Sequence, residues 1–264
     1  MTRSSARAVL ATVALLTLSA AVGCGSEGRD TGTGEAGLGG ARVSWGEPEG
    51  GTPRAVVMLI HGGGWQRSDS GYEEQKADAI SFQSRGYATV AIGYDEGARG
   101  FRQVVDVYEQ ARRRYPNLPI CASGVSAGAN LALMLATREP DLDCVLALSA
   151  PTDLASLAKQ DPEGDEAYQA AVTAFGKDQL AKFSPVRYAD RIKAKVLLIA
   201  AEGDPIVPAD QGRELARALP GSELLVLPPG PVHAQWAHYA GVQPNAQAIA
   251  IKRDFDFLNQ ATQG

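Results

Sequence analysis

The stretch Gly-Val-Ser-Ala-Gly at residues 124–128 decides the fold of this chain. It follows an apolar run that predicts a strand and precedes a segment rich in Leu and Ala that predicts a helix. A serine at the tip of such a turn has a strained backbone, so the residues two before and two after it must be nearly free of side-chain atoms. Gly124 and Gly128 meet that need. The predicted helix also directs its free N–H groups at any negative charge beside Ser126, which makes Ser126 a candidate nucleophile.

Length and composition favour one substantial α/β domain. The chain has 264 residues, of which 45% are hydrophobic and 21% are charged. This is enough for a sizeable core and cramped for two full domains. The formal net charge of −5 provides no basic field for nucleic acid, so we expect no nucleic-acid partner.

The N-terminal residues 1–23 have the pattern of a signal peptide. Arg3 and Arg7 precede an apolar run that ends in small residues before Cys24. This end resembles a bacterial lipoprotein signal, which implies lipidation of Cys24 and an extracytoplasmic, membrane-anchored protein. Plain secretion and an uncleaved anchor are the alternatives. Residues 24–41 are mostly small and polar and predict a flexible tether, so we expect membrane contact only through the lipid.

Residues 42–264 alternate between strand-like and helix-like runs, the signature of a mostly parallel sheet with helices on both faces. The predicted strands are 43–45 (at an edge), 55–60, 87–92, 119–122, 144–148, 195–200 and 224–227. The predicted helices are about 70–86, 101–115, 130–136, 209–219 and an amphipathic one after Pro244.

The first of these helices is predicted in more detail. Ser70 and Glu73 fit a capping box at its start. The predicted buried stripe consists of Tyr72, Ala79, Ile80 and Phe82.

A polar insertion at 152–183 interrupts the alternation, with one short helix predicted between Asp165 as its cap and Gly176 as its end. Its composition lacks the apolar surface expected of a lipase lid. No metal cluster or nucleotide motif is evident in the sequence. The glycines at 62–64 are followed by Trp65 rather than by Lys and Ser, which excludes a phosphate-binding loop. We therefore expect no cofactor.

Reactive groups in a parallel sheet belong at the carboxyl ends of its strands. Four predicted strands end in such residues: the stretch His-Gly-Gly-Gly-Trp at 61–65, then Ser126, Asp204 and His233. The glycines let backbone N–H groups approach an oxygen closely, as an oxyanion hole requires.

The order of glycine loop, Ser, Asp and His resembles that of the α/β-hydrolase superfamily. The glycine loop resembles that of small esterases and kynurenine formamidases, and residues 183–208 are similar to esterases related to prolyl oligopeptidases. The resemblance implies an α/β-hydrolase fold with a small polar cap. It also implies a serine hydrolase in which Ser126 attacks, His233 is the base and Asp204 orients His233.

The remaining site residues follow from the same scheme. The backbone N–H groups of Ala127 and of Gly63 or Gly64 would hold the oxyanion. Trp65 would line the substrate pocket or simply pack nearby, and His61 would brace the glycine loop.

Two alternative residues remain for the acid and the base. Asp153 follows the preceding strand and is a second candidate for the acid. His238 is a second candidate for the base.

Cys121 and Cys144 each lie five residues before a serine at a predicted strand end. If their strands are parallel neighbours in register, the two cysteines come within disulfide reach; the alternative is two free buried thiols.

These features together favour a serine carboxylesterase acting on small or moderately polar esters. An amide hydrolase on the same triad, such as a formamidase or small peptidase, and a non-catalytic binding protein of the same fold are the alternatives.

Overall fold

The computed structural model describes residues 40–157, 166–228 and 244–263. These residues form a fold around a central seven-stranded sheet with the strand order β1-β3-β2-β4-β5-β6-β7. In this sheet only the edge strand β1 is antiparallel to its neighbour. The strands are β1 (Arg42–Gly46), β2 (Val56–Ile60), β3 (Ala88–Gly93), β4 (Ile120–Val125), β5 (Cys144–Leu148), β6 (Lys195–Ala201) and β7 (Glu223–Leu227). The predicted mostly parallel sheet, with residues 43–45 in an edge strand, is confirmed.

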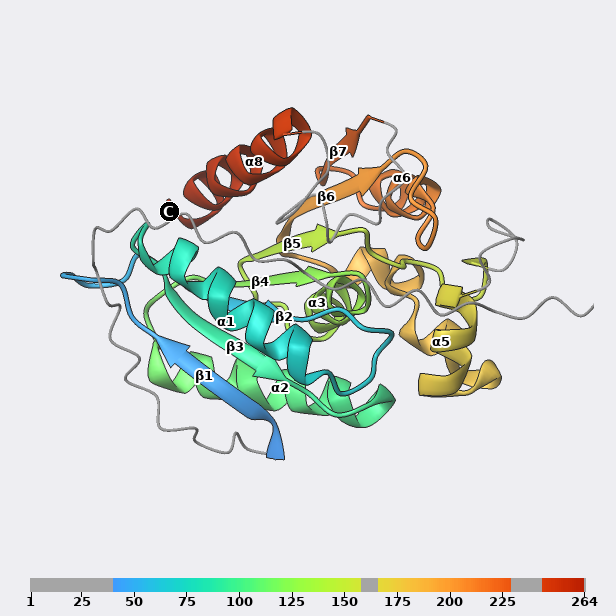
Figure 1. The fold of residues 1–264 in the computed structure, drawn as a ribbon, viewed down its shortest axis with the longest axis horizontal. Helices are drawn as coiled ribbons and strands as arrows, with labels where there is room; N and C mark the ends of the chain where they lie inside the picture. The colour runs from blue at the N-terminus through green and yellow to red at the C-terminus, as the bar shows by residue number, and fades with distance from the viewer. Residues whose placement is uncertain (1–39, 158–165, 229–243, 264) are drawn as a thin grey trace, which may run out of the picture.

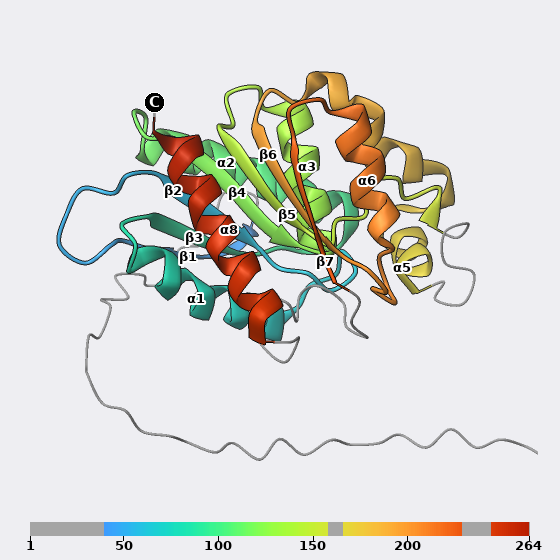
Figure 2. The same ribbon diagram turned by 90° about the horizontal axis from the view of Figure 1, so that it is seen from above.

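Helices cover both faces of this sheet, as the alternating pattern predicts (Figures 1 and 2). Figure 2 shows α1 and α8 on one face, and α2, α3 and α6 on the other. The α-helices are α1 (Asp69–Gln83), α2 (Gly97–Arg114), α3 (Ala127–Arg138), α5 (Glu166–Phe175), α6 (Ala209–Ala218) and α8 (Pro244–Thr262). Two 3₁₀ helices, η2 (Lys177–Phe183) and η3 (Pro185–Arg191), lie between α5 and β6.

Strand β2 shows why the central strands read as unbroken apolar runs. Met58 and Ile60 belong to the core under α2 and α3, whereas Val57 and Leu59 belong to the core under α1 and α8. All four are at most 1% exposed. A strand buried on both faces needs apolar residues at every position, so the alternation seen in half-exposed strands is absent from it.

The start and the buried face of α1 differ from the prediction. Ser68, not Ser70, caps the helix, because the Ser68 hydroxyl accepts a hydrogen bond from the Gly71 N–H at 3.0 Å. Ile80 is 64% exposed rather than buried. It lies about 100° around the helix from the buried Ala79, so both residues cannot face the sheet fully. The predicted capping box and the assignment of Ile80 to the buried stripe are therefore wrong.

The buried face of α1 also contains polar side chains, although the sequence pattern predicted only apolar side chains there. Gln75 and Asp78 are each 8% exposed and lie on the buried side with Tyr72, Ala79 and Phe82. The Gln75 amide donates a hydrogen bond to the Asp78 carboxylate at 3.2 Å. Mutual hydrogen bonding lowers the cost of burying such groups.

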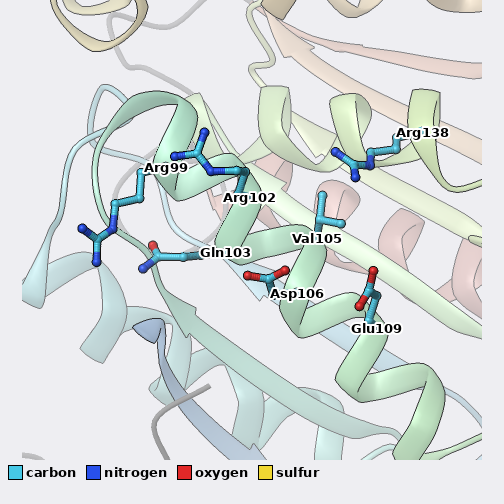
Figure 3. A pocket seen from close by; sticks show the side chains of 7 residues that line it. All are labelled: Arg99, Arg102, Gln103, Val105, Asp106, Glu109 and Arg138. Carbon is cyan, nitrogen blue, oxygen red and sulfur yellow. The ribbon is translucent and has the colours of Figure 1, made fainter. Parts of the chain in front are cut away.

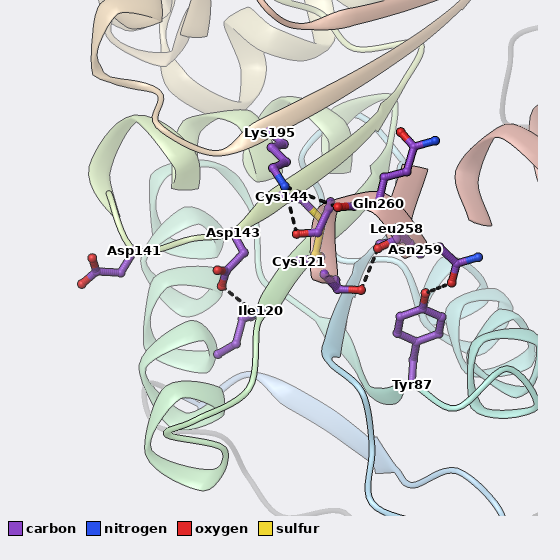
Figure 4. Close-up of a disulfide and its surroundings, with 12 residues drawn as sticks. Tyr87, Ile120, Cys121, Asp141, Asp143, Cys144, Lys195, Leu258, Asn259 and Gln260 are labelled. Atoms are coloured by element: carbon purple, nitrogen blue, oxygen red, sulfur yellow. Dashed lines mark hydrogen bonds between the residues drawn. A yellow bond between two sulfur atoms is a disulfide. The ribbon is translucent and has the colours of Figure 1, made fainter. Parts of the chain in front are cut away.

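A disulfide joins Cys121 of β4 to Cys144 of β5, as Figure 4 shows. The parallel register pairs these two residues directly, and their Cα atoms are 4.5 Å apart. Both cysteines are fully buried in the core under α1 and α8, together with Phe257 and Leu258 of α8. The bond therefore joins the starts of two central strands beneath the C-terminal helix.

The insertion places α5 beyond the carboxyl ends of β4 and β5 (Figure 1). Helix α5 ends before Gly176, whose φ of 81° is a conformation that glycine adopts freely, so the predicted end of the helix is confirmed. Phe175 stacks on Phe183 with ring centroids 3.9 Å apart, and its ring meets that of Trp65 edge-on at 5.5 Å. These rings fix the insertion to the glycine loop of the sheet. The predicted cap Asp165 lies outside the described residues.

None of the helices in the described ranges is long and apolar enough to cross a membrane. The predicted signal peptide, Cys24 and nearly all of the predicted tether lie in residues 1–39, outside those ranges.

Candidate active site

Ser126 lies at the turn between β4 and α3 with φ 54° and ψ −120°. A positive φ is uncommon for a residue with a side chain and stores strain that surrounding contacts must hold. The Ser126 N–H donates to the Leu148 carbonyl of β5 at 2.8 Å, and the Ser126 carbonyl accepts from the Asn130 N–H at 3.1 Å. The end of the sheet and the first turn of α3 therefore hold this serine in its strained conformation.

The two glycines of the pentapeptide are required by close backbone contacts. A Cβ on Gly128 would lie 2.1 Å from the Ile60 carbonyl oxygen of β2. A Cβ on Gly124 would lie 2.4 Å from the Gly128 carbonyl carbon. Both distances are far below contact distance, so the steric reason predicted for these glycines is confirmed.

The glycine loop follows β2 and also relies on unusual backbone angles. Gly63 and Gly64 have φ values of 100° and 63°, and Trp65 has φ 58°. Ala127, by contrast, is the first residue of α3, so its N–H is one of the helix donors that have no acceptor within the helix. The residues predicted for the oxyanion hole thus come from two turns that adjoin at the ends of β2 and β4.

His61 precedes the glycine loop and holds it through buried contacts. It is 1% exposed, and its ring stacks on that of Tyr94 with centroids 4.1 Å apart. Its Nδ1 donates to the Gly62 carbonyl at 2.6 Å, while the Tyr94 hydroxyl donates to the His61 carbonyl at 2.9 Å. Burial lowers the pKa of His61 below its ordinary 6.5, so the ring is neutral at pH 7. This geometry suits a brace rather than a proton-transferring base.

Trp65 has a structural anchor that the sequence did not reveal. Its indole N–H donates to the Asn130 side-chain oxygen at 3.0 Å, and the Asn130 amide donates to the carbonyls of Pro151 and Phe183, both at 2.9 Å. Asn130 is fully buried in the first turn of α3. The sequence did hold a signal for this role of Asn130, which is an amide side chain within a run of Ala and Leu. A buried amide needs hydrogen-bond partners, so its presence there indicates a structural contact. Asn130 ties the glycine loop, α3 and the insertion together.

Asp204 follows β6 and is 6% exposed. One carboxylate oxygen, Oδ1, accepts from the N–H groups of Ile206 and Val207 at 2.9 and 3.0 Å. The other, Oδ2, accepts from the Ser149 hydroxyl at 2.7 Å. Sequence reasoning used Ser149 only to mark a strand end, and no local pattern pointed to this contact.

Asp153, the other candidate acid, is in a different situation. Within the described ranges, its side chain accepts a hydrogen bond only from the nearby Ala155 N–H, at 3.1 Å. Such a bond within a single turn is common for Asp in loops. His233 and His238 lie in 229–243, outside the described residues, so the predicted pairing of acid and base remains a prediction.

Ser126 opens into a cavity of about 280 Å³ beside the glycine loop. The cavity brings together Ser126, Gly63, Gly64 and Trp65 from the predicted site. The other described residues that line it are Gln66, Pro151, Glu166, Ala167, Ala170 and Ile206.

Glu166 is the ionisable side chain among the described residues that line this cavity. It is exposed in the first turn of α5, and its side chain forms no hydrogen bond or ion pair with the described part of the chain. The described wall of the cavity is therefore mildly anionic. Glu166 belongs to no sequence motif, and only the packing of α5 over the strand ends places it there.

A separate cavity of about 410 Å³ lies along α2, where Figure 3 shows Arg99 and Arg102 of α2 and Arg138 at the end of α3. Its charges are mixed, since Asp106 and Glu109 also line it. Of the predicted site residues that lie within the described ranges, none lines this cavity. Within the described ranges, no group of three or more His, Cys, Asp or Glu side chains is placed to hold a metal ion.

A parallel sheet wound between two helix layers, with a strained serine between strand and helix, defines the α/β-hydrolase class. The BD-FAE family model matches residues 46–219. The chain therefore belongs to the BD-FAE family, and the α/β-hydrolase fold predicted from the sequence is confirmed. A search of curated proteins finds no match.

Solved structures share the fold at low sequence identity. A puromycin-hydrolyzing peptidase of Mycobacterium tuberculosis has a TM-score of 0.56 at 23% identity, covering 71% of this chain and 33% of its own. An acylaminoacyl peptidase of Pyrococcus horikoshii has a TM-score of 0.67 at 19%, covering 84% and 40%. An acetyl ester-xyloside bifunctional hydrolase of Caldicellulosiruptor lactoaceticus has a TM-score of 0.69 at 15%, covering 85% and 89%. The chain thus spans only about a third to two fifths of the two peptidases.

Proposed function

We propose that this protein is a serine hydrolase that cleaves carboxylic esters of small or moderately polar substrates through an acyl-enzyme on Ser126. The observation that carries the proposal is the strained Ser126 turn, which opens into a cavity shared with Gly63 and Gly64. Strain held at a serine that faces a cavity is characteristic of a nucleophile.

The chemistry uses groups of this chain alone. The Ser126 hydroxyl attacks the ester carbonyl carbon while His233 takes its proton, and the carbonyl oxygen gains the negative charge. The N–H groups of Ala127 and of Gly63 or Gly64 stabilise that oxyanion; removal of one such donor typically costs about 3 kcal/mol. The protonated His233 then donates its proton to the departing alcohol. Water, deprotonated by His233, finally releases the acid and restores Ser126.

We assign the role of the acid to Asp204 rather than to Asp153. Three donors around the Asp204 carboxylate hold its orientation. An oriented carboxylate beside the end of β6 can stabilise a protonated His233. The single local bond of Asp153 offers no comparable support.

The cavity suggests which esters are accepted. Its volume of about 280 Å³ suits a small acyl or alcohol group, and its described lining combines small apolar side chains with Gln66 and Glu166. The carboxylate of Glu166 repels an anionic substrate and attracts a cationic one. We therefore propose neutral or cationic esters as substrates, with anionic esters disfavoured.

Amide hydrolysis is the second candidate, and the solved structures bear on it. The hydrolase whose printed name includes an acetyl ester is matched over 89% of its length, whereas the two peptidases are matched over 33% and 40% of theirs. An ester substrate therefore agrees with the neighbour of comparable size. The peptidases keep amide cleavage as the alternative.

We also propose that Cys24 carries a lipid and that residues 24–41 tether the domain to a membrane. The basis is the signal-like pattern of residues 1–23. Metabolic labelling with an alkyne fatty acid tests this proposal. Loss of the label in Cys24→Ala supports it, and unlabelled wild-type protein contradicts it.

A fluorophosphonate probe followed by mass spectrometry tests the catalytic proposal. We expect stoichiometric labelling at Ser126 that disappears in Ser126→Ala and in His233→Ala, while circular dichroism shows both variants folded. Hydrolysis of p-nitrophenyl acetate, set beside the matching anilide, separates esterase from amidase activity. A well-folded protein that neither reacts with the probe nor turns over either substrate contradicts the proposal.

A further inference from the structure

Ser149 is the second strained serine at this end of the sheet. It directly follows β5, is 2% exposed and has φ 43°. Glycine adopts such a positive φ without steric cost, and Asn and Asp tolerate it better than most residues. A serine at this position therefore needs a reason other than backbone shape.

The hydroxyl supplies that reason. Ser149 Oγ donates to Asp204 Oδ2 at 2.7 Å, and the backbone N–H groups of Ile206 and Val207 donate to Oδ1. The Asp204 carboxylate is thus held at both of its oxygens. Because Asp204 is 6% exposed, water contributes little to its orientation, and each fixed donor counts for more than it would at the surface.

The backbone places Ser149 between the nucleophile and the acid. The Ser126 N–H bonds to the Leu148 carbonyl, and the next residue, Ser149, bonds through its own N–H to the Ile199 carbonyl of β6 at 2.8 Å. One link therefore reaches the Ser126 turn, and the other reaches the strand that leads to Asp204. From this junction the Ser149 hydroxyl donates to the Asp204 carboxylate.

We propose that Ser149 is a positioning residue: its hydroxyl holds the Asp204 carboxylate in the orientation that His233 requires. This inference rests on the proposed function, because it assigns Ser149 a role through Asp204. Ser149 itself neither touches the substrate nor exchanges a proton with it.

Ser149→Ala and Ser149→Gly form the central pair of variants. Both lack the hydroxyl, but glycine also relieves the strain at φ 43°. We expect kcat for p-nitrophenyl acetate to fall about tenfold in both, with KM unchanged, a factor typical of losing one hydrogen bond to a charged group. Ser149→Gly should melt at the same temperature as Ser149→Ala or higher. An equal loss of kcat in both variants, whichever of them is the more stable, separates positioning from a structural role.

A double-mutant cycle tests whether the effect passes through Asp204. In an Asp204→Ala background, removal of the Ser149 hydroxyl should leave the residual rate unchanged. Ser222→Ala is the matched control, because its hydroxyl donates to the Leu219 carbonyl at 2.9 Å instead. We expect this control to retain the wild-type kcat.

The outcomes distinguish the inference from the proposed function. If Ser149→Gly keeps the wild-type kcat while Ser126→Ala is inactive, the positioning role is wrong and the hydrolase proposal stands. A tenfold loss that persists in the Asp204→Ala background also overturns the positioning role. If Ser126→Ala retains full activity, the proposed function itself fails.

Discussion

The Cys121–Cys144 disulfide should contribute a large share of the stability of the domain. The bond closes a loop with a sequence separation of 23 residues between two central strands. In the chain-entropy account, a loop of that length stabilises the folded state by about 3.4 kcal/mol at 25 °C. With an unfolding entropy of about 2.1 cal/mol/K per residue over a domain of about 220 residues, the expected fall in Tm on losing the bond is about 7 °C.

Reduction of the wild-type protein isolates the cross-link from side-chain packing. Both cysteines are fully buried, so the bond has to be reduced in denaturant and the protein refolded with a reductant present. Thermal unfolding followed by circular dichroism then compares the oxidised and reduced forms. The double variant Cys121→Ala and Cys144→Ala should lose more stability than reduction alone, because it also removes two sulfur atoms from the core.

Activity provides the matched readout for this experiment. Cys121 lies near the start of β4, and Ser126 lies beyond its carboxyl end, about 16 Å along an extended chain. We therefore expect the folded reduced protein to keep its wild-type kcat at 25 °C. An unchanged Tm after verified reduction would refute the entropic reasoning, and a loss of kcat at full folding would show that the bond also shapes the site.

Three further predictions concern the core of the site and its lining. Gly128→Ala should destabilise the fold by about 3 kcal/mol in urea unfolding, because its Cβ would lie 2.1 Å from the Ile60 carbonyl; a wild-type midpoint would contradict the close contact. Burial lowers the pKa of His61 below 6.5, so the unfolded chain binds a proton more readily, and stability should fall as the pH drops below about 6.5. His61→Asn should flatten that dependence, and an equal slope in both proteins would assign it to other groups. The kcat/KM for acetylcholine should be about fivefold higher than that for its neutral isostere, 3,3-dimethylbutyl acetate, because the Glu166 carboxylate attracts the cation. Glu166→Gln should abolish this difference. The control Asp178→Asn, which removes an exposed acid outside the cavity lining, should preserve it. A ratio near one in the wild type, with both esters cleaved, would remove Glu166 as a selector and leave the hydrolase proposal intact.

Local sequence patterns predicted a feature correctly where a few consecutive residues determine burial or steric contact. Strand β2 was predicted because burial on both faces requires a continuous apolar run. The roles of Gly124 and Gly128 were predicted because backbone segments approach each other so closely at a sharp strand-to-helix turn that a Cβ would collide. Equal spacing from two strand ends predicted that Cys121 and Cys144 could pair, whereas the adjacency of their strands was established by the structure.

The pattern failed in α1, where nearby positions satisfy the same local rule almost equally well. Ile80 was placed in the buried stripe of α1, but the polar pair Gln75 and Asp78 lies on that face, and Ile80 faces solvent. Ser70 was read as the cap, but Ser68 is the residue whose hydroxyl reaches a free helix N–H. Hydrophobicity and capping patterns rank such neighbours almost equally, and only the docking of the helix on the sheet separates them.

The sequence by itself determined the class of fold and the order of the candidate site residues, because strand periodicity and glycine sterics act over a few residues. Only the tertiary structure decided which side chains support that site. Asn130 reaches two distant carbonyls, Ser149 reaches Asp204 across 55 positions of the chain, and Glu166 meets the cavity through the packing of α5. Hydrogen bonds and charge act over a few ångströms in space, whatever the distance along the chain, so these partners became visible only after the strands were aligned.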